Sequence, residues 1–299
     1  MFERILLPLD GSELSEMALP YVEELASKLN SEVILYHVQG HENAHLEHMH
    51  QIYLERLAEN VRKNILKGKP QETEVRVTAK IEDGTPTENI CNLVKSNNVD
   101  LIIMTAVSTS GLKVGKMIGS VSDQVCRTVP IPVMLLRPQA FKQIEDKKQL
   151  INRILLPVDG SELSKQALPV GEELASKLRI NITLFQMANI TRFYDDGSGA
   201  TAYMDFAKLD ENEKIRVSAE MTVLEKQLKG KDLDVSNIVT SGFDAAYEII
   251  ELCKKTDIGL IVMSTHGRSG LGRWIFGSVA EKVLHYGEVP ILLVNTRAT

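Results

Sequence analysis

The chain contains two copies of one long segment. Residues 4–29 read RILLPLDGSELSEMALPYVEELASKL and residues 153–178 read RILLPVDGSELSKQALPVGEELASKL, so 21 of 26 positions match at an offset of 149. Further on, Gly119-Ser120-Val121 matches Gly277-Ser278-Val279 at an offset of 158. A repeat of this length indicates a duplication, in which both copies share one architecture. We therefore predict two homologous domains, residues 1–138 and 153–299, joined by a polar linker over residues 139–152.

Each copy alternates short apolar runs with segments of helical spacing. The runs predict buried strands, and apolar positions between residues 14 and 29 recur as on one helix. The expected strands are residues 5–9, 32–38, 74–80, 101–104 and 133–136, and in the second copy 154–158, 181–188, 234–240, 260–263 and 291–294. Strands that alternate with helices form a parallel sheet covered on both faces. We predict an α/β protein of two doubly wound, five-stranded, Rossmann-like domains.

Composition excludes several classes of protein. Apolar residues make up 43% and charged residues 25%, which argues against a disordered or collagen-like chain. The net charge of −6 gives no general attraction to nucleic acid or to an anionic membrane. Three separated cysteines without a CxxC pair suit a reducing compartment. With no apolar run near the roughly 18 residues of a membrane span and no signal-peptide pattern, we expect a cytoplasmic protein.

The ligand site of such a fold is expected beyond the carboxyl ends of the strands. In the second copy Asp159 follows the first strand, and a turn rich in glycine, arginine and hydroxyl residues follows the fourth. Glycine there permits positive φ and close approach of backbone N–H groups to an anion. Ser278 and Glu281 have the spacing of a capping box at a helix start, which is also an anion site. Asp159 is either a ligand to ribose hydroxyls or simply a turn or cap residue.

These motifs resemble those of the universal stress protein family in its tandem two-domain form. The pattern of ATP-binding members is present as Ser264-x2-Gly267-x9-Gly277-Ser278, with serine in place of the first glycine. The resemblance covers both copies. It implies an adenine-nucleotide α-hydrolase-like fold that binds ATP with Mg²⁺ or Mn²⁺. The binding residues that it implies are Pro157, Val158, Asp159, Met187, Met263, Ser264, His266, Gly267, Arg268, Gly270, Gly277, Ser278 and Val279.

The resemblance also implies a role for several of these residues. Asp159 would contact adenosine, and Met187 would contact adenine through its backbone. Gly267, Arg268, Gly277 and Ser278 would bind the phosphates. We expect His266 to be structural or to lie beside the ligand rather than to act as a general base, because no nucleophile or carboxylate pair aligns with it.

The first copy departs from the ATP pattern. Its turn is one residue longer, and Ser108 or Thr109 stands where the second copy has Gly267. It has no arginine, and Lys113 and Lys116 are the nearest cations. A Cβ where backbone must approach a phosphate lowers affinity. We predict that the second domain binds ATP more tightly than the first, which binds it weakly or not at all.

The family resemblance implies that the last strands of the two domains pair within the chain and form a pseudo-dimer. Association of two chains into a homodimer is left open. The leading hypothesis is a stress-response protein that binds ATP as a regulatory ligand. The alternatives are an enzyme that slowly hydrolyses ATP or transfers phosphoryl groups, and a structural interaction module. The enzyme hypothesis is the weaker one, because the sequence has neither a GxxxxGK[ST] loop nor an evident water-positioning carboxylate.

Two further segments carry open alternatives. His41, His45 and His48 have i, i+4 and i+7 spacing, which on a helix forms either a Zn²⁺ site or a solvated polar face. We favour the solvated face, because no partner that would orient the imidazoles is evident. Residues 191–205 of the second copy form either a lid over the nucleotide or a surface loop.

Overall fold

A computed structural model describes most of the chain: residues 1–40, 47–70, 74–107, 118–141, 149–189, 206–231, 233–267 and 276–295. The first half contains β1 (Arg4–Leu9), α1 (Glu13–Glu16), α2 (Leu19–Leu29), β2 (Glu32–Gln39), α3 (Glu47–Leu66), β3 (Val77–Asp83), α4 (Pro86–Ser96), β4 (Leu101–Thr105), α5 (Ser120–Thr128), β5 (Val133–Leu136) and α6 (Pro138–Phe141). The second half contains β6 (Arg153–Pro157), α7 (Glu162–Lys165), α8 (Leu168–Leu178), β7 (Asn181–Asn189), α9 (Phe206–Lys229), β8 (Val235–Gly242), α10 (Ala245–Lys255), β9 (Leu260–Ser264), α11 (Ser278–Tyr286) and β10 (Ile291–Val294). Among these helices, none is both long and apolar enough to span a bilayer.

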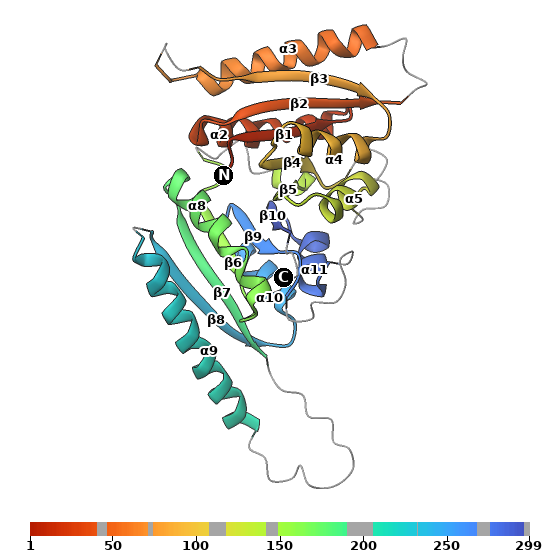
Figure 1. The fold of residues 1–299 in the computed structure, drawn as a ribbon. Helices are drawn as coiled ribbons and strands as arrows, with labels where there is room; N and C mark the ends of the chain where they lie inside the picture. Colours follow the sequence, from red (N-terminus) through yellow and green to blue (C-terminus); the bar gives the residue numbers. More distant parts are fainter. Residues whose placement is uncertain are drawn as a thin grey trace.

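All ten strands form one continuous sheet in the order β3-β2-β1-β4-β5-β10-β9-β6-β7-β8. Within each half the neighbouring strands are parallel, as in a doubly wound domain. The halves join where β5 and β10 pair antiparallel, with Met134 opposite Leu292 (Figure 1). The predicted fold class is confirmed, and the last strands pair within the chain as expected.

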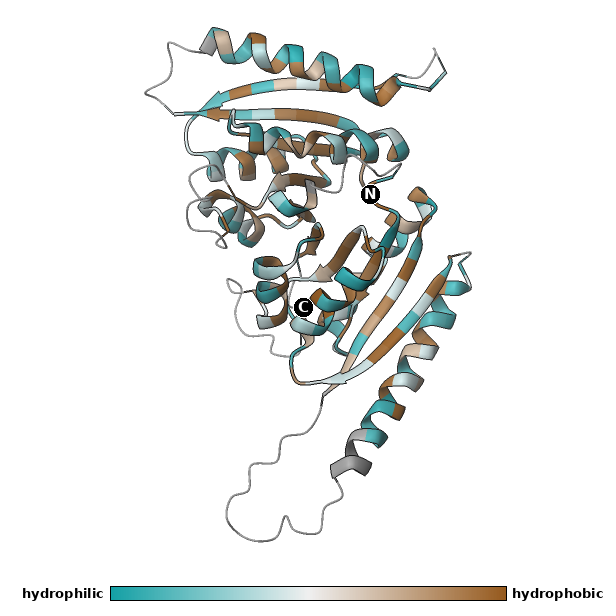
Figure 2. Cartoon of the chain, turned by 180° about the vertical axis from the view of Figure 1, so that it is seen from behind, coloured by the Kyte–Doolittle hydropathy of each residue, from teal (hydrophilic) through white to brown (hydrophobic). Residues whose placement is uncertain are grey.

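Helices cover both faces of the sheet, so the strands are buried on both sides. Alternate residues of β1 enter different cores: Ile5 and Leu7 pack on the side of α2, α3, α8 and α9, and Leu6 packs on the side of α4, α5, α10 and α11. Figure 2 shows the hydrophobic residues concentrated on the central strands, whereas the outer helices alternate between polar and apolar residues. This burial accounts for the near-continuous apolar runs in the sequence.

The helix expected between residues 14 and 29 is broken into two. α1 is a single turn capped by Ser12, and α2 starts at Leu19 with Pro20 in its first turn. Proline has no N–H and its ring clashes with the carbonyl four residues earlier, so it belongs at a helix start. The second half breaks in the same way at Pro169. A consequence is that Met17, expected on the buried face, is 37% exposed.

The segment predicted as a linker is packed at both ends. Ala140 lies in α6 and is buried, as are Leu150 and Ile151. The backbone N–H of Leu150 donates to Glu24 Oε2 at 2.7 Å, which fixes this segment to α2. The flanks of residues 139–152 therefore belong to the core between the domains, and residues 142–148 lie outside the described part of the chain.

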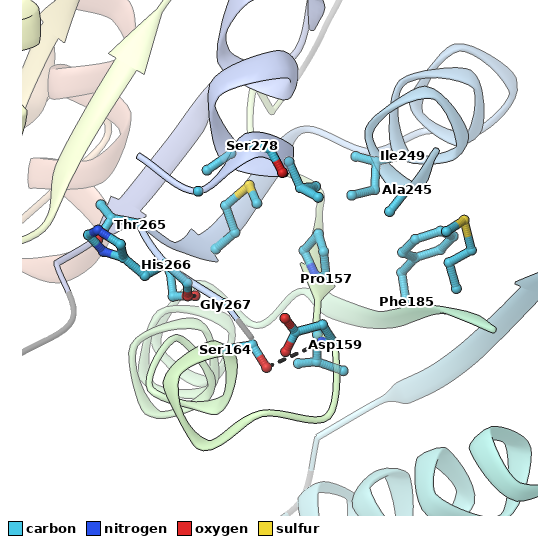
Figure 3. Close-up of a pocket in the computed structure, with 17 residues that line it drawn as sticks. Pro157, Asp159, Ser164, Phe185, Ala245, Ile249, Thr265, His266, Gly267 and Ser278 are labelled. Carbon is cyan, nitrogen blue, oxygen red and sulfur yellow. Dashed lines mark hydrogen bonds between the residues drawn. The ribbon is translucent and has the colours of Figure 1, made fainter. Parts of the chain in front are cut away.

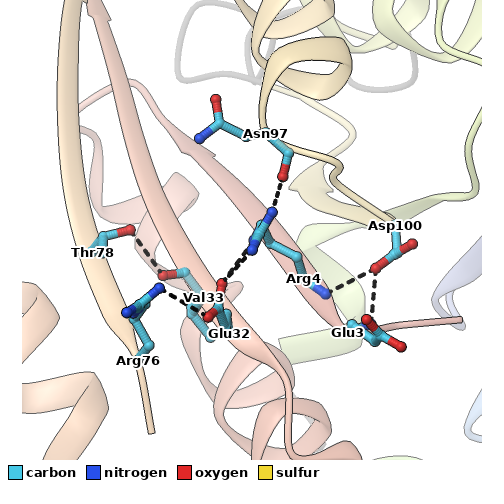
Figure 4. A network of polar contacts seen from close by, with 8 residues as sticks. All are labelled: Glu3, Arg4, Glu32, Val33, Arg76, Thr78, Asn97 and Asp100. Atoms are coloured by element: carbon cyan, nitrogen blue, oxygen red, sulfur yellow. Dashed lines mark hydrogen bonds and ion pairs between the residues drawn. The ribbon is translucent and has the colours of Figure 1, made fainter.

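A polar network ties together the amino ends of the strands in the first domain (Figure 4). Arg4 Nε donates to Glu32 Oε2 at 2.8 Å, and Arg76 Nη1 donates to Glu32 Oε1 at 3.3 Å. The backbone N–H groups of Glu3 and Arg4 donate to Asp100 Oδ2 at 3.0 and 3.1 Å. This network fixes β1 to its neighbours on both sides, at the edge opposite the one where a ligand is expected.

Candidate functional site

A cavity of about 280 Å³ lies at the carboxyl edge of the second domain, between the ends of β6, β7 and β9 and the starts of α10 and α11 (Figure 3). Its walls come from segments more than 100 residues apart in the sequence. The lining residues are Pro157, Val158, Asp159, Ser164, Phe185, Met187, Ala245, Ile249, Met263, Ser264, Thr265, His266, Gly267, Gly277, Ser278, Val279 and Ala280.

The structure gathers the predicted site residues around this one cavity. Of the thirteen, all line it except Arg268 and Gly270, which lie outside the described residues. Three separate segments converge because β6 lies between β7 and β9 in the sheet. The convergence follows from the strand order, and what the residues bind stays a prediction.

Asp159 holds the turn between β6 and α7 with one carboxylate oxygen. Its Oδ1 accepts the backbone N–H of Ser161 at 2.9 Å and the hydroxyl of the same residue at 2.6 Å. Ser161 in turn caps α7 by accepting the N–H of Ser164 at 3.1 Å. Asp159 is therefore a turn residue, as one alternative held. Its second oxygen, Oδ2, lies beside Gly267 at the cavity wall, so both alternatives are compatible with its position.

Neither Gly267 nor Gly277 uses the positive φ that glycine permits. Gly277 has φ −60°, and Gly267 is absent from the positive-φ residues of the described chain. A Cβ at Gly267 would lie 2.3 Å from Asp159 Oδ2, a severe clash. A Cβ at Gly277 would lie 3.4 Å from the carbonyl oxygen of Thr265. Close approach of Asp159 therefore accounts for the glycine at Gly267, whereas a Cβ at Gly277 would make an ordinary van der Waals contact.

The expected capping box at α11 is not formed. Gly277 is the N-cap, so Ser278 is the first helical residue, and no side chain caps the helix. Gly277 N–H donates to the carbonyl oxygen of Thr265 at 2.8 Å, which holds the start of the helix against the end of β9. Ser278 and Val279 line the cavity. The positive end of the helix dipole therefore lies at the cavity wall, where it favours an anion.

The turn after β9 is held by its own side chains. Ser264 Oγ donates to the carbonyl oxygen of His266 at 2.6 Å, and the Thr265 hydroxyl lies 3.0 Å from His266 Nδ1. Ser264 is buried, and its small side chain fits where the family pattern has glycine. The contact with Thr265 orients the imidazole, consistent with the structural role expected for His266.

Several lining residues were missed by the sequence motifs. They are Ser164, Phe185, Ala245, Ile249, Thr265 and Ala280. Phe185 lies on the same strand face as Met187, and Ala245 and Ile249 are one turn apart on α10. The period of two along β7 and the four-residue spacing on α10 were signals that would have identified them. Phe185, Met187, Ala245, Ile249 and Met263 form the apolar floor of the cavity.

The first domain has a smaller cavity at the equivalent place. Its volume is about 140 Å³, and Asp10, Val38 and Gly119 line it. Tyr36 replaces Phe185, and its hydroxyl donates to Glu82 Oε2 at 2.5 Å. Burial and Glu82 raise the pKa of Tyr36, so it stays a neutral donor. The turn over residues 108–117 lies outside the described residues, so the predicted difference in ATP affinity remains a prediction.

The proposed Zn²⁺ residues fall mostly outside the described chain. His48 lies in α3, whereas His41 and His45 lie outside the described residues. Within the ranges the structure describes, no group of three or more histidine, cysteine or acidic residues is arranged to hold a metal ion. His37 and His50 pack edge to face with ring centroids 4.9 Å apart. Residues 191–205, the other open segment, also lie outside the described ranges.

Comparison with known proteins gives consistent matches. A family model described as the universal stress protein family matches residues 1–137 and 151–295. Universal stress protein YxiE of Bacillus subtilis is 29% identical over 149 residues, 49% of this chain and all of that protein. A crystal structure of a universal stress protein from Archaeoglobus fulgidus covers 99% of both chains at 19% identity with a TM-score of 0.69. A universal stress protein solved in complex with cAMP covers 46% of this chain at 19% identity with a TM-score of 0.33.

Proposed function

Because this chain belongs to the universal stress protein family, we propose that its second domain binds an adenine nucleotide, ATP, as a regulatory ligand in the stress response. The observation that carries the proposal is the convergence of Asp159, Gly267 and the start of α11 on one cavity. These groups come from separate parts of the sequence and supply a hydroxyl acceptor and a positive helix end, which the close packing of Gly267 against Asp159 brings to one place.

The chemistry of the cavity suits the parts of a nucleotide. The apolar floor of Phe185, Met187 and Ile249 offers a surface for a purine ring. Asp159 stands where ribose hydroxyls would donate to it. The cavity volume of about 280 Å³ is near the lower end of small-molecule sites, which span about 300–1,000 Å³. A nucleoside would fill it, with the phosphates at the rim beside Gly277 and Ser278.

The residues present also fit the cation that accompanies ATP. Among the described residues that line the cavity, Asp159 is the one carboxylate. Mg²⁺ in nucleotide sites keeps several waters and is held largely by the substrate's phosphates, so with Asp159 at the ribose end the phosphates and water would supply most of its ligands. The cation would neutralise phosphate charge. A single carboxylate already engaged in a turn is poorly placed to position an attacking water, so we propose slow or no hydrolysis.

The test is calorimetric titration of the full chain with Mg-ATP after nucleotide has been removed by denaturation and refolding. We expect about one ATP per chain. Gly277→Val should abolish tight binding, because the side chain would enter the space beside the Thr265 carbonyl. Gly119→Val, the same change at the equivalent position of the first domain, should leave it intact. Absence of binding by both heat and thermal shift would refute the proposal, and steady release of phosphate would favour the enzyme alternative.

A further inference from the structure

A residue of the first domain contacts the nucleotide-site turn of the second. The guanidinium of Arg127, on α5, lies 4.5 Å from the ring centroid of Phe276. Phe276 is 5% exposed and directly precedes Gly277, the N-cap of α11. A guanidinium over an aromatic face is an attractive cation–π contact, and burial of the ring strengthens it. The contact therefore connects one domain to the candidate phosphate site of the other.

The guanidinium of Arg127 is held in place from its other side. Its Nε donates to both carboxylate oxygens of Asp123 at 2.9 Å, and its Nη2 lies 2.8 Å from Asp123 Oδ1. Asp123 is one turn earlier on α5, so the helix itself fixes the orientation of the plane. Asp123 also raises the pKa of Arg127, which stays charged. The ring of Phe276 thus rests on a rigid surface.

The contact lies beside the strand pair that joins the domains. Arg137 Nε, just after β5, donates to the carbonyl oxygen of Leu284 in α11 at 2.6 Å. In the reverse direction, Asn295 Nδ2, just after β10, donates to the carbonyl oxygen of Val129 at the end of α5 at 2.6 Å. These reciprocal bonds hold α5 and α11 across the junction, where Figure 1 shows both helices next to β5 and β10.

The stacking contact, unlike these bonds, exists in one direction only. At the offset of 158, Ile118 stands in the first domain where the second has Phe276, and His285 stands in the second domain where the first has Arg127. Isoleucine has no aromatic face for a cation. At these described positions the contact therefore has no counterpart in the other direction, and the start of α11 that it supports belongs to the domain with the larger cavity.

We infer that Arg127 is a positioning residue for the phosphate-binding turn of the second domain, so that the first domain completes the second domain's nucleotide site. The inference rests on the proposed function. Gly277 has no side chain to fix it; its N–H donates to Thr265, its carbonyl accepts from the N–H of Glu281, and the ring of Phe276 anchors it on the other side. Without the guanidinium the ring loses one of its supports and keeps only its packing in the hydrophobic core, which leaves its position less closely defined. The N–H groups beside it then lose their alignment with phosphate oxygens, while the nucleoside end at Asp159 is unaffected.

The experiment compares ATP and adenosine affinities of the full chain, with adenosine measured by competition against ATP. Arg127→Met and Arg127→Lys should each weaken ATP binding by about three- to tenfold, the range that corresponds to one cation–π contact, and leave adenosine binding unchanged. Lysine keeps the charge but loses the planar surface. Phe276→Leu should give the same loss, and adding it to Arg127→Met should cause no further loss. His285→Met, at the equivalent position, is the control and should bind ATP like the wild type.

The outcomes separate this inference from the proposed function. If the wild type does not bind ATP, the proposed function fails and this inference fails with it. If the wild type binds ATP and the Arg127 variants match it, only the inference is wrong. Full retention of affinity by Arg127→Lys would mean that charge, rather than stacking, matters and would overturn it. Equal loss for ATP and adenosine, with a lower melting temperature of the ligand-free protein, would show a general structural role instead.

Discussion

Adding one methyl group at Gly267 is expected to destabilise the second domain. The new Cβ would lie 2.3 Å from Asp159 Oδ2, whereas real Cβ contacts stay beyond about 3.0 Å, so these two atoms must separate by at least about 0.7 Å. If the Asp159 carboxylate rotates away, its two bonds to Ser161 are lost. Each is worth about 0.5–1.5 kcal/mol, which gives a total of about 1–3 kcal/mol. If the turn moves instead, overpacking costs a similar amount.

The measurement is urea denaturation of Gly267→Ala followed by circular dichroism. We expect the free energy of unfolding to fall by about 1–3 kcal/mol, with Gly40→Ala as the control, because a Cβ at Gly40 meets nothing within 4 Å. In an Asp159→Ala background, which removes the clashing carboxylate, Gly267→Ala should cost little. A Gly267→Ala protein as stable as the wild type, or an undiminished loss in the Asp159→Ala background, would refute this explanation of the glycine.

Two further predictions concern ionisation. The ion pair with Lys282, at 2.7 Å, lowers the pKa of Asp244 below its ordinary value of 3.8. The pair therefore stabilises the fold above about pH 4, and this stabilisation is lost as the pH falls through the lowered pKa. Asp244→Asn should reduce the loss of unfolding free energy at acid pH, by under about 1 kcal/mol because the pair is exposed. An unchanged loss at acid pH in urea denaturation would contradict this. Burial raises the pKa of Cys253 to about 12 and raises that of Cys126 as well. Cys91 and Cys253 are partly exposed, whereas Cys126 is buried. At pH 8 a thiolate-selective reagent should therefore modify Cys91 first, Cys253 more slowly and Cys126 only after unfolding, as mass spectrometry would show; prompt labelling of Cys126 would contradict its burial.

The fold could be predicted from the sequence because each strand is a local apolar run and the duplication presents the same order of strands and helices twice. Strand runs such as residues 133–136 and 291–294 match β5 and β10 at both ends. The break at Pro20 was missed because apolar spacing continues across it, although proline itself marks it. The third strands were placed up to three residues too early, since β3 begins at Val77 where alternation between polar and apolar residues is weak.

The spacing of the motifs was sufficient to predict the polar and glycine residues that line the cavity, but not the residues of its apolar floor. Ile249 reaches the cavity because α10 follows β8 and packs over the sheet, which no short motif encodes. Likewise, the reason for Gly267 depends on Asp159, more than 100 residues away. The contact between Arg127 and Phe276 forms only when the two domains pack together. The two residues are 149 positions apart in the sequence, so no local pattern predicts that they meet.

The antiparallel pairing of β5 with β10 makes this chain the covalent counterpart of a twofold dimer. Dilution cannot separate the two halves, because the tether keeps the effective concentration of one half around the other high at any protein concentration. Because the two halves are parts of one chain, they can also differ in sequence. In a homodimer every substitution appears twice and must be tolerated on both sides of the axis. Here Phe276 and Ile118 occupy equivalent positions and differ, and the cavities of the two halves differ in volume as well.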